Sequence, residues 1–208
     1  VVAGIVNAAN KNALGRKALE AVVEVHKDAR LPEFQSATLR RTEKARIGRR
    51  AEGRAAGPTP GKVALFAPCY GNVNEPGVNQ DLIAVFEHNG IPVTLARKEQ
   101  CCGMPKLELG DLEAVNAGKE ANIPVLLELV RDGWDIVAPI PSCVLMFKQE
   151  LRLMYPDDPA VQEVAARMFD PFEYLMLRHK HGVLNLDFKQ PLGNVVYQAS
   201  CHQRVQNI

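Results

Sequence analysis

Five cysteines carry most of the chemistry that this 208-residue chain offers, namely Cys69, Cys101, Cys102, Cys143 and Cys201. Thiolates bind zinc and are the usual ligands of iron–sulfur clusters. A disulfide framework is disfavoured because the number of cysteines is odd and we find no secretory signal. Scattered buried thiols are the alternative, since free cysteine is among the most buried residue types. The spacing of the cysteines favours a metal or iron–sulfur site.

The cysteines follow segments that have the pattern of buried parallel strands. These segments and their cysteines are 63–68 with Cys69, 92–96 with Cys101 and Cys102, and 135–140 with Cys143. The carboxyl ends of parallel strands share one edge of a sheet, where ligands bind. Four thiols that are distant in sequence should therefore converge there. Cys143 should also lie near a helix N-terminus, whose partial positive charge favours a thiolate or an anionic cluster.

The elements between these strands predict an α/β fold with a parallel βαβ layered sheet. One helix is indicated over the first 30 residues, others over 79–88, 111–132, 142–154 and 170–181, and one that starts at 158. A further strand is indicated over 193–200. We expect a kink or interruption near Pro124, because proline lacks the N–H that a helix interior needs. Ser142 and Asp170 are predicted N-caps.

Charge is unevenly distributed along a chain whose net charge is only +1. Residues 1–60 contain twelve Lys or Arg against six Asp or Glu, and most of the excess lies between Arg40 and Arg54. This segment is predicted to be a solvated helix or linker, or else a docking site for an acidic partner or an anionic membrane surface. The overall balance argues against a nucleic-acid-binding protein. No apolar run approaches the length of a membrane span.

An internal repeat sets the expected domain organisation. Residues 61–69 and 193–201 align without gaps and share Gly, Val, Ala and Cys at the same offsets. We therefore expect a helical basic connector and linker over 1–60, a first cysteine-rich unit over 61–182, and over 183–208 a linker and the opening strand of a second, truncated unit. The chain is expected to be a piece of a longer protein.

The motif Cys101-Cys-Gly-Met-Pro105, with Cys69 upstream and Pro141-Ser-Cys143 downstream, resembles the cysteine-rich CCG domain. This domain occurs in a subunit of heterodisulfide reductase and in the iron–sulfur subunits of glycolate oxidase and anaerobic glycerol-3-phosphate dehydrogenase. The resemblance is greatest to the last of these families, through residues 143–148 and 197–203. The first 60 residues resemble the connector after a ferredoxin-like domain.

The resemblance implies that Cys69, Cys101, Cys102 and Cys143 bind an iron–sulfur cluster, expected to be 4Fe-4S. Gly103, Pro105 and Ser142 would support the ligand loops. The chain departs from the family at Met146, which stands where the second cysteine of a Cys-x-x-Cys element is expected. We interpret Met146 as a core residue, because a thioether is a weak ligand beside thiolates. Cys201 and His202 are candidates for an incomplete second site.

The resemblance further implies an electron-transfer subunit without its own catalytic residues. Its partners would be a flavoprotein dehydrogenase subunit, of glycerol-3-phosphate or 2-hydroxy-acid type, and a quinone or disulfide acceptor. The protein is expected in the cytoplasm, where it could also bind peripherally to the inner face of the cytoplasmic membrane. The alternative from the residues alone is a zinc-binding or metal-free interaction module, because four thiolates also suit tetrahedral zinc. A dinucleotide-binding enzyme is disfavoured, since residues 69–77 lack the Gly-x-Gly-x-x-Gly spacing.

Overall fold

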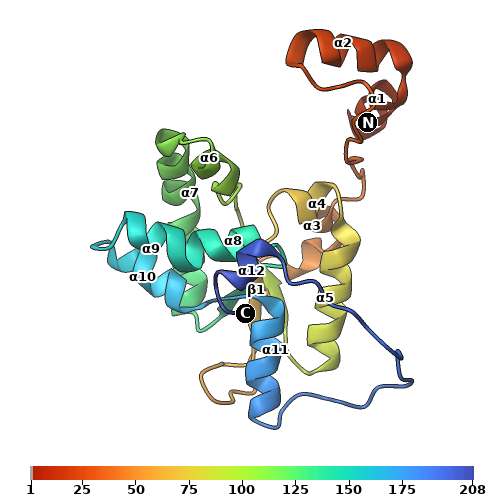
Figure 1. Ribbon diagram of the computed structural model, residues 1–208. Coiled ribbons are helices and arrows are strands. Elements are labelled where there is room, and N and C mark those ends of the chain that lie inside the picture. The colour runs from red at the N-terminus through yellow and green to blue at the C-terminus, as the bar shows by residue number, and fades with distance from the viewer. Residues whose placement is uncertain (1) are drawn as a thin grey trace.

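Four parallel strands form the centre of the molecule in a computed structural model that describes residues 2–208 (Figure 1). The strands are β1 (Val63–Leu65), β2 (Val93–Leu95), β3 (Asp135–Val137) and β4 (Met168–Phe169), in the order β2-β1-β3-β4. Every strand residue is buried. Because parallel sheets are covered on both faces, their strands read as continuous apolar runs, and the predicted α/β class is confirmed.

Two hydrophobic cores lie on opposite faces of this sheet. Alternate residues of β1 divide between them, with Ala64 in one core and Val63 and Leu65 in the other. The first face is covered by α7 (Leu112–Arg131), α8 (Pro141–Leu145), the π-helical turn η2 (Met146–Glu150), α9 (Leu151–Met154) and α10 (Pro159–Ala166). The second is covered by α5 (Pro76–His88) and α11 (Pro171–Lys180), with Leu39.

Helix ends follow local capping chemistry. Asp170 and Glu173 form the predicted capping box of α11, and Asp158 accepts hydrogen bonds from two backbone N–H groups at the start of α10. The predicted interruption at Pro124 does not occur, because α7 runs through this proline, and a kink there stays a prediction. The predicted cap at Ser142 is wrong: α8 begins at Pro141, and Ile140 occupies the N-cap without a side-chain bond. Proline suits the first helical turn because no N–H is needed there.

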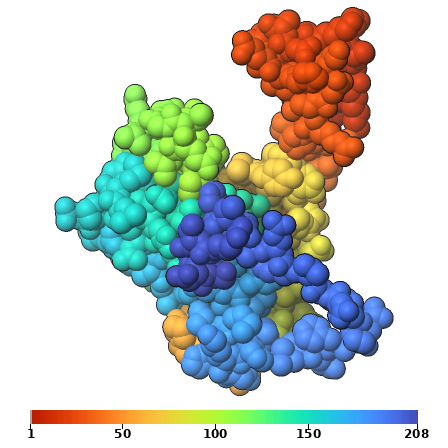
Figure 2. Space-filling model, in the orientation of Figure 1, coloured from red at the N-terminus to blue at the C-terminus, as the bar shows by residue number. Residues whose placement is uncertain are grey.

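The N-terminal region forms a helical hairpin and an irregular segment, so the single helix expected over the first 30 residues is wrong. Its elements are α1 (Val2–Lys11), α2 (Ala13–Val23), α3 (Leu39–Thr42) and the short 3₁₀ turn η1 (Lys44–Arg46). Asn12 separates α1 from α2, since its side chain accepts hydrogen bonds from the N–H groups of Leu14 and Gly15. The hairpin extends away from the sheet, and Figure 2 shows it in red as a lobe that projects from the rest of the surface. Among residues 2–208, no helix is both long and apolar enough to cross a membrane.

The basic segment is only partly the solvated helix or linker that its composition predicted, because some of its residues pack against the sheet while others are exposed. Leu39 is fully buried in the second core, and Ile47 forms a parallel bridge to Leu95 of the edge strand. Arg46 pairs with Glu43 and Glu87, and Arg49 also pairs with Glu87. These arginines thus find their acidic partners within the chain, so residues 39–49 pack against the sheet.

The C-terminal region also differs from its prediction, because residues 193–200 form no strand. A strand needs a neighbour for its backbone hydrogen bonds, and no strand of residues 2–208 lies beside this segment. The chain ends instead in α12 (Cys201–Arg204), which starts with a capping box of Ser200 and Gln203. This helix packs on α8, and the Gln203 side chain donates a buried hydrogen bond to Asp170.

A buried carboxyl lies at the amino edge of the sheet. Asp135 opens β3 with a fully buried side chain and pairs with Arg167 at 2.8 Å. Nearby, the almost fully buried Arg178 donates to the carbonyl of Arg54 (2.6 Å) and to the hydroxyl of Thr59 (3.2 Å). Burial raises the pKa of Asp135 to about 7, although Arg167 and Arg178 favour its charged form.

We predict that Asp135→Asn stabilises the protein increasingly as pH rises. The fold favours the protonated Asp135, so its contribution is fully present below its unfolded pKa of 3.8 and is lost as pH rises through about 7. The difference in unfolding free energy, variant minus wild type, should therefore increase by up to roughly 4 kcal/mol between pH 4 and pH 8. Urea unfolding over this range measures it, and a difference independent of pH would contradict the raised pKa.

Candidate metal centre

Three loops bring cysteines to the carboxyl edge of the sheet. Cys69 follows β1 and directly precedes α4 (Tyr70–Val73). Cys101 and Cys102 follow β2 and precede α6 (Met104–Glu108), while Cys143 lies in the first turn of α8, after β3. Because β1 is the neighbour of both β2 and β3, these loops begin side by side.

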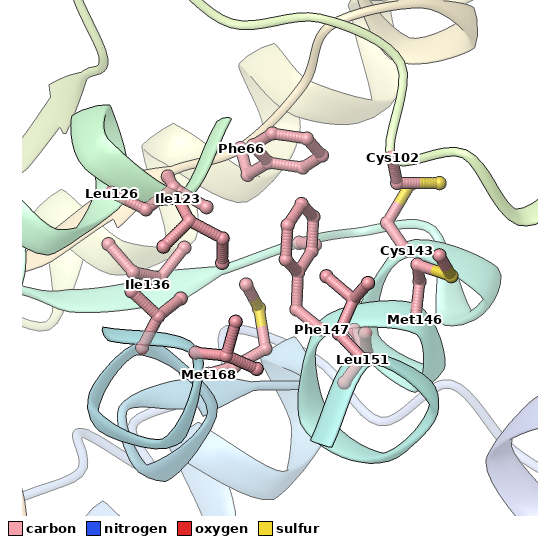
Figure 3. Close-up of a cluster of buried hydrophobic side chains, with 14 of the residues drawn as sticks. Phe66, Cys102, Ile123, Leu126, Ile136, Cys143, Met146, Phe147, Leu151 and Met168 are labelled. Atoms are coloured by element: carbon pink, nitrogen blue, oxygen red, sulfur yellow. The ribbon is translucent and has the colours of Figure 1, made fainter. Parts of the chain in front are cut away.

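The four thiols lie close enough together for neighbouring thiols to shift the pKa values of three of them. The pKa of Cys101 responds to Cys69 and Cys102, that of Cys102 responds to Cys101 and Cys143, and that of Cys143 responds to the other three thiols. Figure 3 shows Cys102 and Cys143 with their sulfur atoms on the same side of the core. In residues 2–208, no group of three or more His, Cys, Asp or Glu side chains is arranged to hold a metal ion as it stands. The structure therefore brings the four predicted thiols, here called the thiol series, into one region, although not in the arrangement of a metal site.

The thiol series runs from the protein surface into its interior. Cys69 and Cys101 are exposed, whereas Cys102 and Cys143 are only 4% and 3% exposed and belong to the first hydrophobic core. One side of the series is thus accessible to a docking partner, and the other is shielded from water.

The two buried thiols shift each other's pKa in opposite directions. The neighbouring Cys143 thiol lowers the pKa of Cys102 to about 7, against the opposing effect of burial, and the Met104 N–H also favours the Cys102 thiolate. The neighbouring Cys102 thiol and burial raise the pKa of Cys143. Cys143 lies in the first turn of α8, as predicted, but in the metal-free chain these effects oppose the thiolate that a helix N-terminus favours. Burial also raises the pKa of Cys101.

The predicted supporting residues lie around these thiols in different roles. Gly103 is the N-cap of α6 and has a φ of +93°, a conformation that side chains other than glycine rarely adopt. Pro105 lies in the first turn of α6. Ser142 does not cap its helix; its hydroxyl is 2.9 Å from Nδ1 of His202. His202 is thereby held beside the first turn of α8, whereas its neighbour Cys201 is exposed at the start of α12.

Several residues that the sequence analysis missed hold the cysteine loops. Asn122 on α7 accepts a hydrogen bond from the Gln100 N–H (2.8 Å) and donates one to the carbonyl of Cys101 (3.2 Å). The signal for Asn122 is a polar residue in the apolar stripe of a helix, between Val115 and Leu126. Glu99 accepts the N–H of Ala67 and pairs with Arg40, two contacts that no pattern in the sequence indicates.

Met146 lies at the edge of the thiol site but within the hydrophobic core. It is fully buried and begins the π-helical turn η2. Its methyl group would lie 3.6 Å from a Cβ added at Gly103, so it packs against the bend of the Cys101–Cys102 loop. This packing accounts for an apolar residue at the position.

Comparison with known proteins identifies the class of domain. Residues 63–148 match the family model of the cysteine-rich CCG domain. The resemblance inferred from the cysteine motif is therefore confirmed. No solved structure matches the chain.

The chain is similar to two kinds of curated protein. It is 28% identical over 205 residues to a subunit of anaerobic glycerol-3-phosphate dehydrogenase from Escherichia coli K12, covering 96% of this chain and 48% of that protein. It is 28% identical over 149 residues to lactate utilization protein A of Shouchella clausii (67% of this chain, 57% of that protein) and 31% identical over 147 residues to a Bacillus cereus homologue (68% and 57%). The chain thus spans about half the length of these relatives.

We predict that Met146→Ser lowers the stability of the metal-free protein by about 2–4 kcal/mol, because it truncates a core side chain and buries a hydroxyl. Urea unfolding under reducing conditions measures the loss. Met176→Ser is the matched control, since Met176 is 50% exposed on α11 and should change stability by less than about 0.5 kcal/mol. Equal effects of the two substitutions would contradict a core role for Met146.

Proposed function

We propose that Cys69, Cys101, Cys102 and Cys143 bind one iron–sulfur cluster and that the chain relays electrons as part of a dehydrogenase complex. The observation that supports this most is the convergence of four thiols, from the ends of three adjacent strands, at one edge of the sheet, where neighbouring thiols shift their pKa values. Four thiolates are the usual ligand set of a four-iron cluster. Such a cluster, when bound, supplies one-electron oxidation and reduction.

The residues present suit this role in charge and accessibility. Cys102, with its lowered pKa, is the first thiol ready to bind as a thiolate. Cys102 and Cys143 shield one side of the site from water, while the exposed Cys69 and Cys101 leave a short path for electrons to a docked partner. No residue of this chain needs to act as an acid, base or nucleophile on a substrate, so the proposed role is electron transfer alone.

The relatives supply the proposed context. One is named as a subunit of anaerobic glycerol-3-phosphate dehydrogenase and others as lactate utilization proteins. We propose that this chain accepts electrons from a flavoprotein subunit that oxidises glycerol 3-phosphate or a 2-hydroxy acid, and passes them to a quinone or disulfide. A cytoplasmic location, with peripheral contact to the membrane, fits such a complex. The unit boundaries at 60/61 and 182/183 belong to this proposal.

We predict that Cys102→Ser abolishes cluster binding, because it removes the thiolate at the centre of the series. Protein purified without oxygen and reconstituted with iron and sulfide should contain about four irons per chain in the wild type and less than about a tenth of that in the variant. Elemental analysis and electron paramagnetic resonance (EPR) measure the loss.

Two control variants sharpen this test. Cys201→Ser removes an exposed thiol outside the series, and Met146→Ser removes the thioether beside it; both should retain the iron content per folded chain and the EPR signal. Zinc in place of iron in the anaerobic wild type would support the interaction module instead. Loss of the cluster in Met146→Ser would make Met146 a ligand.

A further inference from the structure

The loops that carry Cys69 and Cys101 are joined by a buried carboxylate. Glu99 lies two residues before Cys101, and its side chain is only 2% exposed. One carboxylate oxygen, Oε2, accepts the N–H of Ala67 at 3.3 Å, two residues before Cys69. Glu99 therefore spans from the second cysteine loop to the first.

Arg40, from the basic segment, holds this carboxylate and both loops at once. Its Nη1 donates to Oε1 of Glu99 at 2.9 Å, and its Nη2 donates to the carbonyls of Ala96 and Arg97, each at 2.8 Å. Its backbone N–H donates to Oδ1 of Asn72 on α4, directly after Cys69, at 3.0 Å. One residue distant in sequence thus contacts the exits of β1 and β2.

The chemistry of this contact requires arginine. A guanidinium presents several N–H donors in a fixed plane, so it can bind a carboxylate and two carbonyls together. A lysine ammonium carries the same charge but lacks that planar geometry. A buried ion pair is also weak evidence for stability, because removing both charges from water costs about as much as their attraction returns. The arrangement is better explained by what it positions.

We infer that Arg40 and Glu99 are positioning residues that fix the Cys69 loop against the Cys101–Cys102 loop and so set the geometry of the thiol centre. This inference rests on the proposed function, since it assigns the pair to the proposed cluster. It also gives the basic segment a role: Arg40 is part of the support of the metal centre.

The same segment contains a matched control. Arg46 also forms an ion pair that spans distant parts of the chain, with Glu87 on α5. Its side chain contacts Glu87 on α5, and its backbone carbonyl accepts a hydrogen bond from the hydroxyl of Thr94. Neither contact involves a cysteine loop. Arg46→Gln therefore removes an arginine–glutamate pair of the segment without touching the loops.

The test compares Glu99→Gln, Arg40→Gln, Arg40→Lys and Arg46→Gln in the full chain. After reconstitution with iron and sulfide, the rate of iron release to a chelator should rise about tenfold or more in the first two variants, as for other groups that orient metal ligands. Their EPR spectra should also shift. Arg40→Lys should give a release rate and spectrum between those of the wild type and Arg40→Gln. Arg46→Gln should lower the melting temperature while keeping the wild-type release rate and spectrum.

A second probe separates this inference from the proposed function. Cobalt(II) added to the reduced, metal-free chain reports thiolate coordination by its absorption, and its affinity should fall about tenfold in Glu99→Gln. Cobalt binding without cluster binding in the wild type would overturn the proposed function and leave the inference standing. Wild-type release rates and spectra in Glu99→Gln and Arg40→Gln, or equal changes in Arg46→Gln, would overturn the inference alone. A wild type that binds neither metal would overturn both.

Discussion

The position of the thiols depends on the register of three parallel strands, which pair without an offset. Val63 of the central strand is opposite both Val93 and Asp135, and Leu65 is opposite both Leu95 and Val137. The three strands therefore end at the same height, and their loops start from one line. A slip of one residue would displace a loop by about 3.3 Å, more than the length of a hydrogen bond. Both hydrophobic cores oppose such a slip, because it would turn every buried side chain of the strand to the other face.

The sheet brings the loops together, but polar contacts decide how they lie. Loops lack the regular backbone bonding of strands, so their conformation must be held by side chains from elsewhere. Asn122 holds the second loop from α7, and Asn79 on α5 donates to the carbonyl of Gly71 in the first. The two thiol loops are thus anchored to helices on opposite faces of the sheet. Arg40 and Glu99 provide the contact between them.

The parts of the fold that local chemistry determines could be predicted from the sequence. The three apolar runs before the cysteines gave the strands, and the motif around Asp170 gave the start of α11. By contrast, β4 has only two residues, too few for a pattern, and residues 193–200 have the composition of a strand but no strand beside them. The prediction for the basic segment failed for the same reason. Composition reports its charge, but the carboxylates that pair with it, Glu87 and Glu99, are placed by tertiary structure.

The candidate site shows the same division between local and distant determinants. Each cysteine could be assigned to a strand end because strand length and loop position are local properties. The acidity of each thiol could not, because it depends on which other thiols lie beside it. The Cys143 thiol lowers the pKa of Cys102, while Cys102 and burial raise that of Cys143. In the metal-free chain, the acidity of a thiol is therefore a property of the whole group, and its own position along the sequence does not determine it.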